Sequence, residues 1–85
     1  MQDLEYFKLE LKKPLLIIKA KNGLLGCGYV NVDVCNRTGD ACAIVTGVSQ
    51  FEEMLTASVV AISENAAKLG INIGDSGKSA LHKLA

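Results

Sequence analysis

The chain has 85 residues, of which 49% are hydrophobic and 21% are charged, and its nine basic residues balance nine acidic ones. A zero net charge with scattered lysines argues against nucleic-acid binding, and no run approaches the roughly 20 apolar residues of a membrane helix. The N-terminus lacks the apolar run of a signal peptide, so the sequence predicts one cytoplasmic domain over residues 1–85. The cysteines number three, and free thiols are expected in that compartment.

The first expected strand covers residues 4–11, where apolar and polar residues alternate until Pro14 interrupts the pattern. A strand at an open sheet edge is a template for pairing with another chain. The apolar content is also high for a domain of this size, which buries only about 60–65% of its unfolded surface. Oligomerisation, with this strand as a candidate element for it, is the expected extra source of stability.

Two β-rich runs, 15–20 and 24–30, flank the pair Asn22-Gly23. An Asn-Gly pair between such runs is typical of a β-hairpin, because a type I′ turn needs φ > 0 at both central residues. With these two residues as the loop, the predicted pairs are Lys21 with Leu24, Ile18 with Cys27, and Leu16 with Tyr29.

This register places one apolar set on the core face of the hairpin. The set comprises Leu16, Ile18, Ala20, Leu25, Cys27 and Tyr29. The opposite face is bare around Gly26 and Gly28, and a glycine inside a strand indicates a bulge or a close approach by a neighbour.

Asn31 is a suitable N-cap for a helix over residues 32–38, with Asp33 in the first turn and Gly39 as a left-handed stop. Residues 41–48 are apolar in both alternating sets, which predicts a central strand covered on both faces.

Ser49 and Glu52 form a predicted capping box for a helix carrying Phe51, Met54 and Leu55. The remaining expected elements are a strand over 58–62, a helix from a Ser63 cap to Gly70, and a helix over about 75–84 with Ala80, Leu81 and Leu84 inward. The order is therefore β-β-β-α-β-α-β-α-α. It predicts an α+β fold with a mixed sheet, in which an N-terminal strand and hairpin join a central sheet covered by three or four short helices.

Two motifs do not carry the chemistry that they suggest. The segment 77–79, Gly-Lys-Ser, lacks the glycine that a phosphate-binding loop needs at position 72, where Asn72 stands. The three cysteines lie eight and seven residues apart, which is no zinc-finger spacing. No metal site is predicted, and the sequence identifies no cofactor.

The first candidate site is the segment Gly26-Cys27-Gly28-Tyr29, which leads to Asn31 at an expected helix start. A strand that ends at a helix N-terminus presents free N–H groups, which suit a small anion. The alternative interpretation is ordinary hairpin packing and capping, with Cys27 as an inert core thiol.

The second candidate site lies at the two ends of the central strand, at Gly39-Asp40-Ala41 and at Thr46-Gly47-Val48, with Asp40, Thr46 and Gly47 as the candidate binding residues. A carboxylate before a buried run needs hydrogen-bond donors or a cation. If the strands over 24–30, 41–48 and 58–62 were all parallel, four residues would gather at the sheet edge where ligands bind in open α/β sheets. These residues are Asn31, Gly47, Ser49 and Ser63.

The pair of segments Cys27-Gly28-Tyr29-Val30-Asn31 and Gly39-Asp40-Ala41-Cys42-Ala43-Ile44-Val45-Thr46-Gly47-Val48 resembles the YunC-like domain of unknown function, a family of small bacterial and archaeal proteins. Supporting similarities lie at 14–20, 51–55, 67–71 and 80–81, so the resemblance covers most of the chain from Pro14 to Leu84. It implies an α/β protein whose N-terminal β region forms a tetramer, and it implies no specific activity.

Two functions are compatible with these observations. One is a homo-oligomeric structural or small-ligand-binding protein, whose partners are further copies of itself and a small anionic ligand near Asn31 or Thr46-Gly47. The other is a small enzyme with a site at strand ends, built around Cys27 and Asp40 and shared between subunits. Neither nucleic acid nor a membrane is an expected partner.

Overall fold

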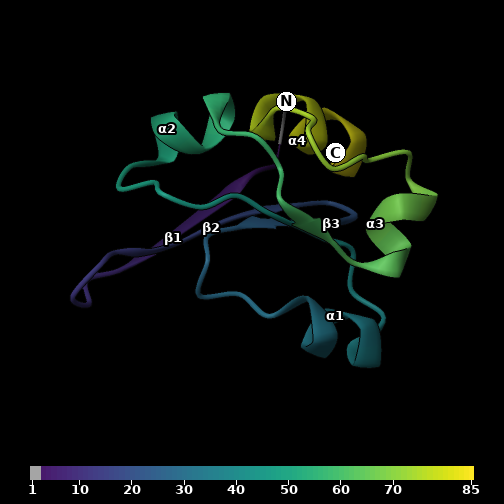
Figure 1. The fold of residues 1–85 in the computed structure, drawn as a ribbon, viewed down its shortest axis with the longest axis horizontal. Helices are drawn as coiled ribbons and strands as arrows, with labels where there is room; N and C mark the ends of the chain where they lie inside the picture. The colour runs from purple at the N-terminus through teal and green to yellow at the C-terminus, as the bar shows by residue number, and fades with distance from the viewer. Residues whose placement is uncertain (1–2) are drawn as a thin grey trace.

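The computed structural model describes residues 3–85, so Met1 and Gln2 of the expected domain lie outside the described residues. The elements follow in the predicted order of strands and helices (Figure 1). Their bounds are β1 Glu5–Leu9, β2 Leu15–Ala20, β3 Gly23–Gly26, α1 Val32–Thr38, β4 Cys42–Ile44, α2 Phe51–Thr56, β5 Ala61–Ile62, α3 Glu64–Lys68 and α4 Gly77–Leu84.

All the strands belong to one sheet, in the sequential order β1-β2-β3-β4-β5. β1, β2 and β3 are antiparallel neighbours, β3 and β4 are parallel, and β4 and β5 are antiparallel. The mixed α+β fold predicted from the sequence is therefore confirmed. The arrangement in which all three of the later strands are parallel, considered from the sequence as one possibility, does not occur, because β5 is antiparallel to β4.

The β2–β3 hairpin has a different register from the predicted one. Its pairs are Ile17 with Gly26, Ile18 with Leu25, Lys19 with Leu24, and Ala20 with Gly23, so Lys21 and Asn22 form the turn. Gly23 is already a strand residue, and a Cβ at this position would collide with the backbone oxygen of Ala41. The glycine thus permits the close approach of β4 and does not serve the turn.

The predicted core face of the hairpin nevertheless holds for five of its six residues. Leu16, Ile18, Ala20, Leu25 and Cys27 are buried. The register is displaced by two residues, and a displacement by an even number keeps every side chain on its original face. Tyr29 is the exception, because β3 ends at Gly26 and the tyrosine is 49% exposed in the loop that follows.

Two apolar clusters lie on opposite faces of the sheet. The larger contains β-sheet residues together with Met54 of α2, Ala66 of α3, and Ala80, Leu81 and Leu84 of α4. The smaller contains Cys35 of α1 with Cys42 and Ile44 of β4. Figure 1 shows α2 and α4 on one side of the sheet and α1 alone on the other. The inward positions predicted for α4 are confirmed.

The close approach predicted at the glycines of β3 occurs at Gly26. A Cβ there would lie 2.5 Å from Cγ2 of Val30. Val30 belongs to the turn that leads from β3 to α1, and its amide donates to the Cys27 carbonyl at 3.0 Å. Gly26 therefore lets the chain fold back tightly at the end of β3.

Two of the helix N-caps are the predicted residues, and a third lies one residue away from its predicted position. Asn31 caps α1 and Ser63 caps α3, as predicted. For α2 the predicted pair of Ser49 with Glu52 is wrong by one residue, because Gln50 occupies the N-cap position. Oε1 of Glu53 accepts hydrogen bonds from the Ser49 and Gln50 amides, at 2.7 and 3.1 Å.

The two later strands are shorter than expected. The chain leaves β4 after Ile44 and turns at Gly47, where φ is 72°. Ahead of β5, Ser58 bridges to Ser76 and the Val59 amide donates to the Asp75 carbonyl at 2.8 Å. The first half of the expected strand therefore pairs with the loop before α4.

That loop carries an acid-sensitive contact at Asp75. Oδ2 of Asp75 accepts from the Asn72 amide at 2.9 Å and from Nζ of Lys83 at 3.0 Å. The Asn72 amide first, and the Lys83 ammonium second, hold the pKa of the Asp75 carboxyl below its usual range. A carboxyl whose pKa is lower in the folded state stabilises the fold above its unfolded pKa and loses this effect as pH falls.

We expect Asp75→Asn to reduce the acid sensitivity of the protein. As the pH falls from neutral through about 4 and below, the free energy of unfolding of the unmodified chain should decrease more than that of the variant. Urea denaturation across this range measures the difference. If the free energy of unfolding fell equally with pH in both proteins, the Asp75 contacts would contribute nothing to acid sensitivity.

Candidate functional site

The parallel pairing of β3 and β4 places their carboxyl ends at the same sheet edge. Gly26 pairs with Ile44, and the Val45 amide donates to the Gly26 carbonyl at 2.9 Å. The residues after Gly26 and those after Val45 consequently form neighbouring loops. Ligands of open α/β sheets bind at such carboxyl ends.

These two loops and the β1–β2 connection enclose a pocket of about 260 Å³. The residues that line it are Lys13, Pro14, Cys27, Gly28, Tyr29, Thr46, Gly47 and Val48. Five of the seven predicted site residues are therefore brought together. Sequence reasoning missed Lys13 and Pro14, because their approach depends on how the β1–β2 connection folds over the edge.

The lining combines one cation with mostly apolar and uncharged polar groups. Lys13 is the charged residue of the lining, Tyr29 and Thr46 are residues that carry hydroxyls, and Pro14 and Val48 are apolar. No carboxylate occurs among these lining residues, so an anion would meet no like charge there. The lining therefore combines one positively charged residue with a mostly apolar surface.

The Cys27 thiol lies in this lining but is 4% exposed. Its Sγ accepts a hydrogen bond from the Leu16 amide at 3.4 Å. A reactive thiol needs a partly exposed, electropositive setting. The contacts of Cys27 therefore match the core interpretation made from the sequence.

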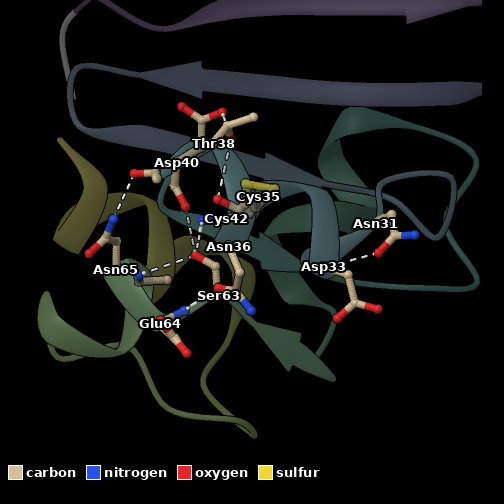
Figure 2. The surroundings of a disulfide bond; sticks show 12 residues. Asn31, Asp33, Cys35, Asn36, Thr38, Asp40, Cys42, Ser63, Glu64 and Asn65 are labelled. Atoms are coloured by element: carbon tan, nitrogen blue, oxygen red, sulfur yellow. Dashed lines mark hydrogen bonds between the residues drawn. A yellow bond between two sulfur atoms is a disulfide. The ribbon is translucent and has the colours of Figure 1, made fainter.

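Asn31 is not among the residues that line this pocket. Its side-chain oxygen accepts the Asp33 amide at 2.8 Å and caps α1 (Figure 2). The cap hydrogen bond occupies one of the free N–H groups at the start of α1. The anion site predicted from the sequence required groups of this type. Asn31 thus positions the crossover helix.

Asp40 lies at the opposite end of the β3–β4 pair from Cys27, just before β4. Its Oδ2 accepts from the Thr38 hydroxyl at 2.7 Å, which supplies the expected donor (Figure 2). Asp40 lines a second depression of about 430 Å³ together with Lys19 and Lys21. One chain therefore does not bring Cys27 and Asp40 into a common site.

Ser63 also lies at this opposite end, because β5 is antiparallel to β4. The gathering of Ser63 with Asn31, Gly47 and Ser49 at one edge, which required parallel strands, therefore does not occur. Oγ of Ser63 donates to the Asp40 carbonyl at 2.8 Å and accepts from the Cys42 amide at 2.9 Å (Figure 2). It also accepts from the Ala66 amide at 3.3 Å, as the cap of α3.

Replacing Ser63 by alanine should lower the free energy of unfolding by about 2 kcal/mol, since it removes a cap and leaves the buried Cys42 amide without its partner. Ser76→Ala is the matched control, because Ser76 caps α4 through the Ser79 amide and lies exposed. The control should cost about 1 kcal/mol. If urea denaturation gave equal losses of unfolding free energy for both variants, the hydrogen bond between Ser63 and the Cys42 amide of β4 would contribute nothing to stability.

The prediction of three free thiols is wrong for two of them. Cys35 and Cys42 form a disulfide, with a Cα–Cα distance of 6.4 Å (Figure 2). Cys35 faces inward from α1 and Cys42 faces α1 from β4, so the fold places residues seven apart in contact. An odd number of cysteines gave no indication of this pair in the sequence. Cys27 is the free cysteine.

Within residues 3–85 no group of three or more His, Cys, Asp or Glu side chains is arranged to hold a metal ion. No helix in the same part of the chain has the length and apolar character needed to cross a membrane.

Comparison with known proteins places the chain in a family. Residues 26–84 match the family described as "Domain of unknown function (DUF1805)". The chain is also similar to a solved structure, that of a protein of unknown function from Thermoplasma acidophilum. The two share 33% sequence identity with a TM-score of 0.84, over 98% of this chain and 94% of that one. No curated protein matches the chain. The match over residues 26–84 spans both loops of the strand-end pocket, and the chain belongs to the DUF1805 family.

Proposed function

We propose that this protein is a homo-oligomer that binds a small anionic ligand in the pocket at the carboxyl ends of β3 and β4. The observation that carries the proposal is the convergence of two loops, 27–29 and 46–48, with Lys13 at one pocket. The parallel strand pair causes this convergence, and ligand sites recur at such positions.

The pocket chemistry favours a ligand with one acidic group and a small apolar body. The Lys13 ammonium and the Thr46 hydroxyl would bind the acidic group, while Pro14, Val48 and the Tyr29 ring would contact the apolar part. A volume of about 260 Å³ is large enough to receive part or all of a small metabolite.

The N-terminal region supports self-association. Every residue of β1 is exposed, and β1 stands at one edge of the sheet, with no strand on its outer side among residues 3–85. Phe7, Leu9 and Leu11 are exposed apolar residues of this region. Edge strands of this kind pair with other chains, and the resemblance to YunC-like proteins implies a tetramer formed through the N-terminal β region.

The position of Cys27 in the pocket lining favours a catalytic alternative. In this alternative Cys27 would act with Tyr29 or Thr46 on a ligand held by Lys13. Asp40 could join such a site only from a second subunit, because it lies at the other end of its own sheet. The burial of the thiol and its bond to the Leu16 amide make binding the better-supported function.

Lys13→Ala tests the pocket, and Lys12→Ala is its matched control because Lys12 is an exposed lysine outside the lining. The probes are small carboxylates and phosphate monoesters, screened by thermal shift, with calorimetry on those that bind. We expect Lys13→Ala to weaken binding about tenfold or more, as for a lost charge-assisted hydrogen bond, and Lys12→Ala to leave it unchanged. Failure of all probes to bind, or equal weakening by both variants, would contradict the proposed site.

A further inference from the structure

The disulfide between Cys35 and Cys42 fastens α1 to β4 on the face of the sheet opposite the main core. α1 has seven residues, and Cys35 is its buried residue. Isolated helices shorter than about 12–15 residues are marginal in water and depend on tertiary packing. The buried side chain through which α1 packs on the sheet is therefore that of Cys35, which the disulfide holds in place.

Other contacts hold the C-terminal end of α1 more than its start. Asn36 Oδ1 accepts from the Glu64 amide at 2.8 Å, and Asn65 Nδ2 donates to the Gly39 carbonyl at 2.7 Å (Figure 2). In the first half of the helix Val32 is partly buried and Val34 is 46% exposed. The N-terminal half is held by the packing of Val32, and the disulfide adds a covalent restraint at Cys35, the middle residue of the helix.

Release of α1 would leave the main core in place. That core is formed by the sheet with α2, α3 and α4, and none of its residues comes from α1. Figure 1 shows α1 by itself on its side of the sheet. Elements with few buried contacts open locally at a lower free energy than the rest of a protein.

We propose that Cys35 and Cys42 are a reversible redox pair that controls the docking of α1. The disulfide form holds α1 on the sheet, and the dithiol form releases the helix while the remaining fold persists. This goes beyond the proposed function and does not depend on a ligand.

The exchange requires a dithiol as reductant. Both cysteine residues are buried, at 6% and 0% exposure, so the attack takes place when α1 opens locally. One thiolate of the dithiol then attacks Sγ of Cys35, and the Cys35–Cys42 bond breaks. The electron pair goes to Sγ of Cys42, which takes up a proton. The second thiol of the dithiol then displaces Cys35 as a thiol, so the protein gains two electrons and two protons and the dithiol becomes a disulfide.

The release has two structural consequences. It uncovers the smaller apolar cluster, in which Leu24, Ile44 and Ala61 pack beneath α1. It also frees the segment that joins β3 to α1, which carries Gly28 and Tyr29 of the strand-end pocket. The redox state would therefore change both the α1 face and one wall of the pocket.

Hydrogen exchange with mass spectrometry on the full chain tests the proposal. The chain is equilibrated with reduced or with oxidised dithiothreitol under native conditions, and alkylation counts the thiols. We expect reduction to add two thiols and to accelerate exchange at least about tenfold in 32–38, with little change in β2 and α4, reversibly on reoxidation.

Three results would overturn the proposal: no reduction under native conditions, unchanged exchange of α1 after reduction, or accelerated exchange throughout the chain. The double variant Cys35→Ala, Cys42→Ala should reproduce the reduced pattern without a reductant. A folded double variant with a fully protected α1 would also overturn it. If the double variant does not fold, the core depends on the bond and the proposal fails.

Discussion

Gly77→Ala should lower the free energy of unfolding by about 3 kcal/mol or more. Gly77 begins α4, and a Cβ at this position would overlap the backbone carbonyl of Met54 in α2. The same Cβ would lie 3.2 Å from Cδ2 of Leu25 in the core. Because the obstacle is a backbone atom, relief requires α2 and α4 to move apart, and this disrupts the packing of both helices on the sheet.

Lys78→Ala is the control for this substitution, because Lys78 is the next residue of the same helix and is exposed. Alanine is a better helix former than lysine by only a few tenths of a kcal/mol, so this variant should be nearly neutral. Chemical denaturation measures both free energies. Near-neutral behaviour of Gly77→Ala would show that α2 and α4 are not packed as closely as the structure places them.

Leu25→Ala should cost about 3–4 kcal/mol, the loss typical of a large cavity in a tight core. Leu25 is fully buried in the centre of β3, where it pairs with Ile18. Neighbouring elements cover it on the face of the main core. The cavity would be surrounded by strands and helices that the sheet holds in place, which limits their collapse.

Leu69→Ala is the matched control, since Leu69 is 39% exposed at the end of α3. It should cost no more than about 1 kcal/mol. Equal effects of the two substitutions in urea denaturation would contradict the position of Leu25 at the centre of the core.

Local chemistry made the order of the elements predictable. Asn31 and Ser63 have side chains that cap helices, and Gly39 takes the left-handed conformation, with φ of 85°. The period-two pattern of β2 and β3 also identified the buried face correctly. These features depend on residues close in sequence, so they do not require knowledge of the tertiary structure.

Contacts between distant segments could not be predicted in the same way. Asn22-Gly23 is a strong hairpin pattern, but in the structure Asn22 donates to the Leu84 carbonyl at 2.8 Å and Gly23 meets β4. Ser63 lies beside Asp40 because β5 is antiparallel to β4. No local sequence pattern predicts the direction of that strand. The Cys35–Cys42 pair likewise arises from the packing of α1 on β4.

The candidate site was predictable where it depended on the carboxyl ends of β3 and β4. Cys27, Gly28, Tyr29, Thr46 and Gly47 line one pocket as a consequence of the parallel pair. The contribution of Lys13 depends on the β1–β2 connection, whose path no local pattern specifies.

Native mass spectrometry of the protein, purified without added ligands, tests most directly whether it is an oligomer with a bound small molecule. The chain has a mass of 9.0 kDa, so each added subunit and each retained ligand can be resolved in one spectrum. We predict an oligomer that carries a small acidic molecule, and loss of that molecule in Lys13→Ala with the subunit number unchanged. A bare monomer at micromolar concentration would contradict both the self-association and the ligand site.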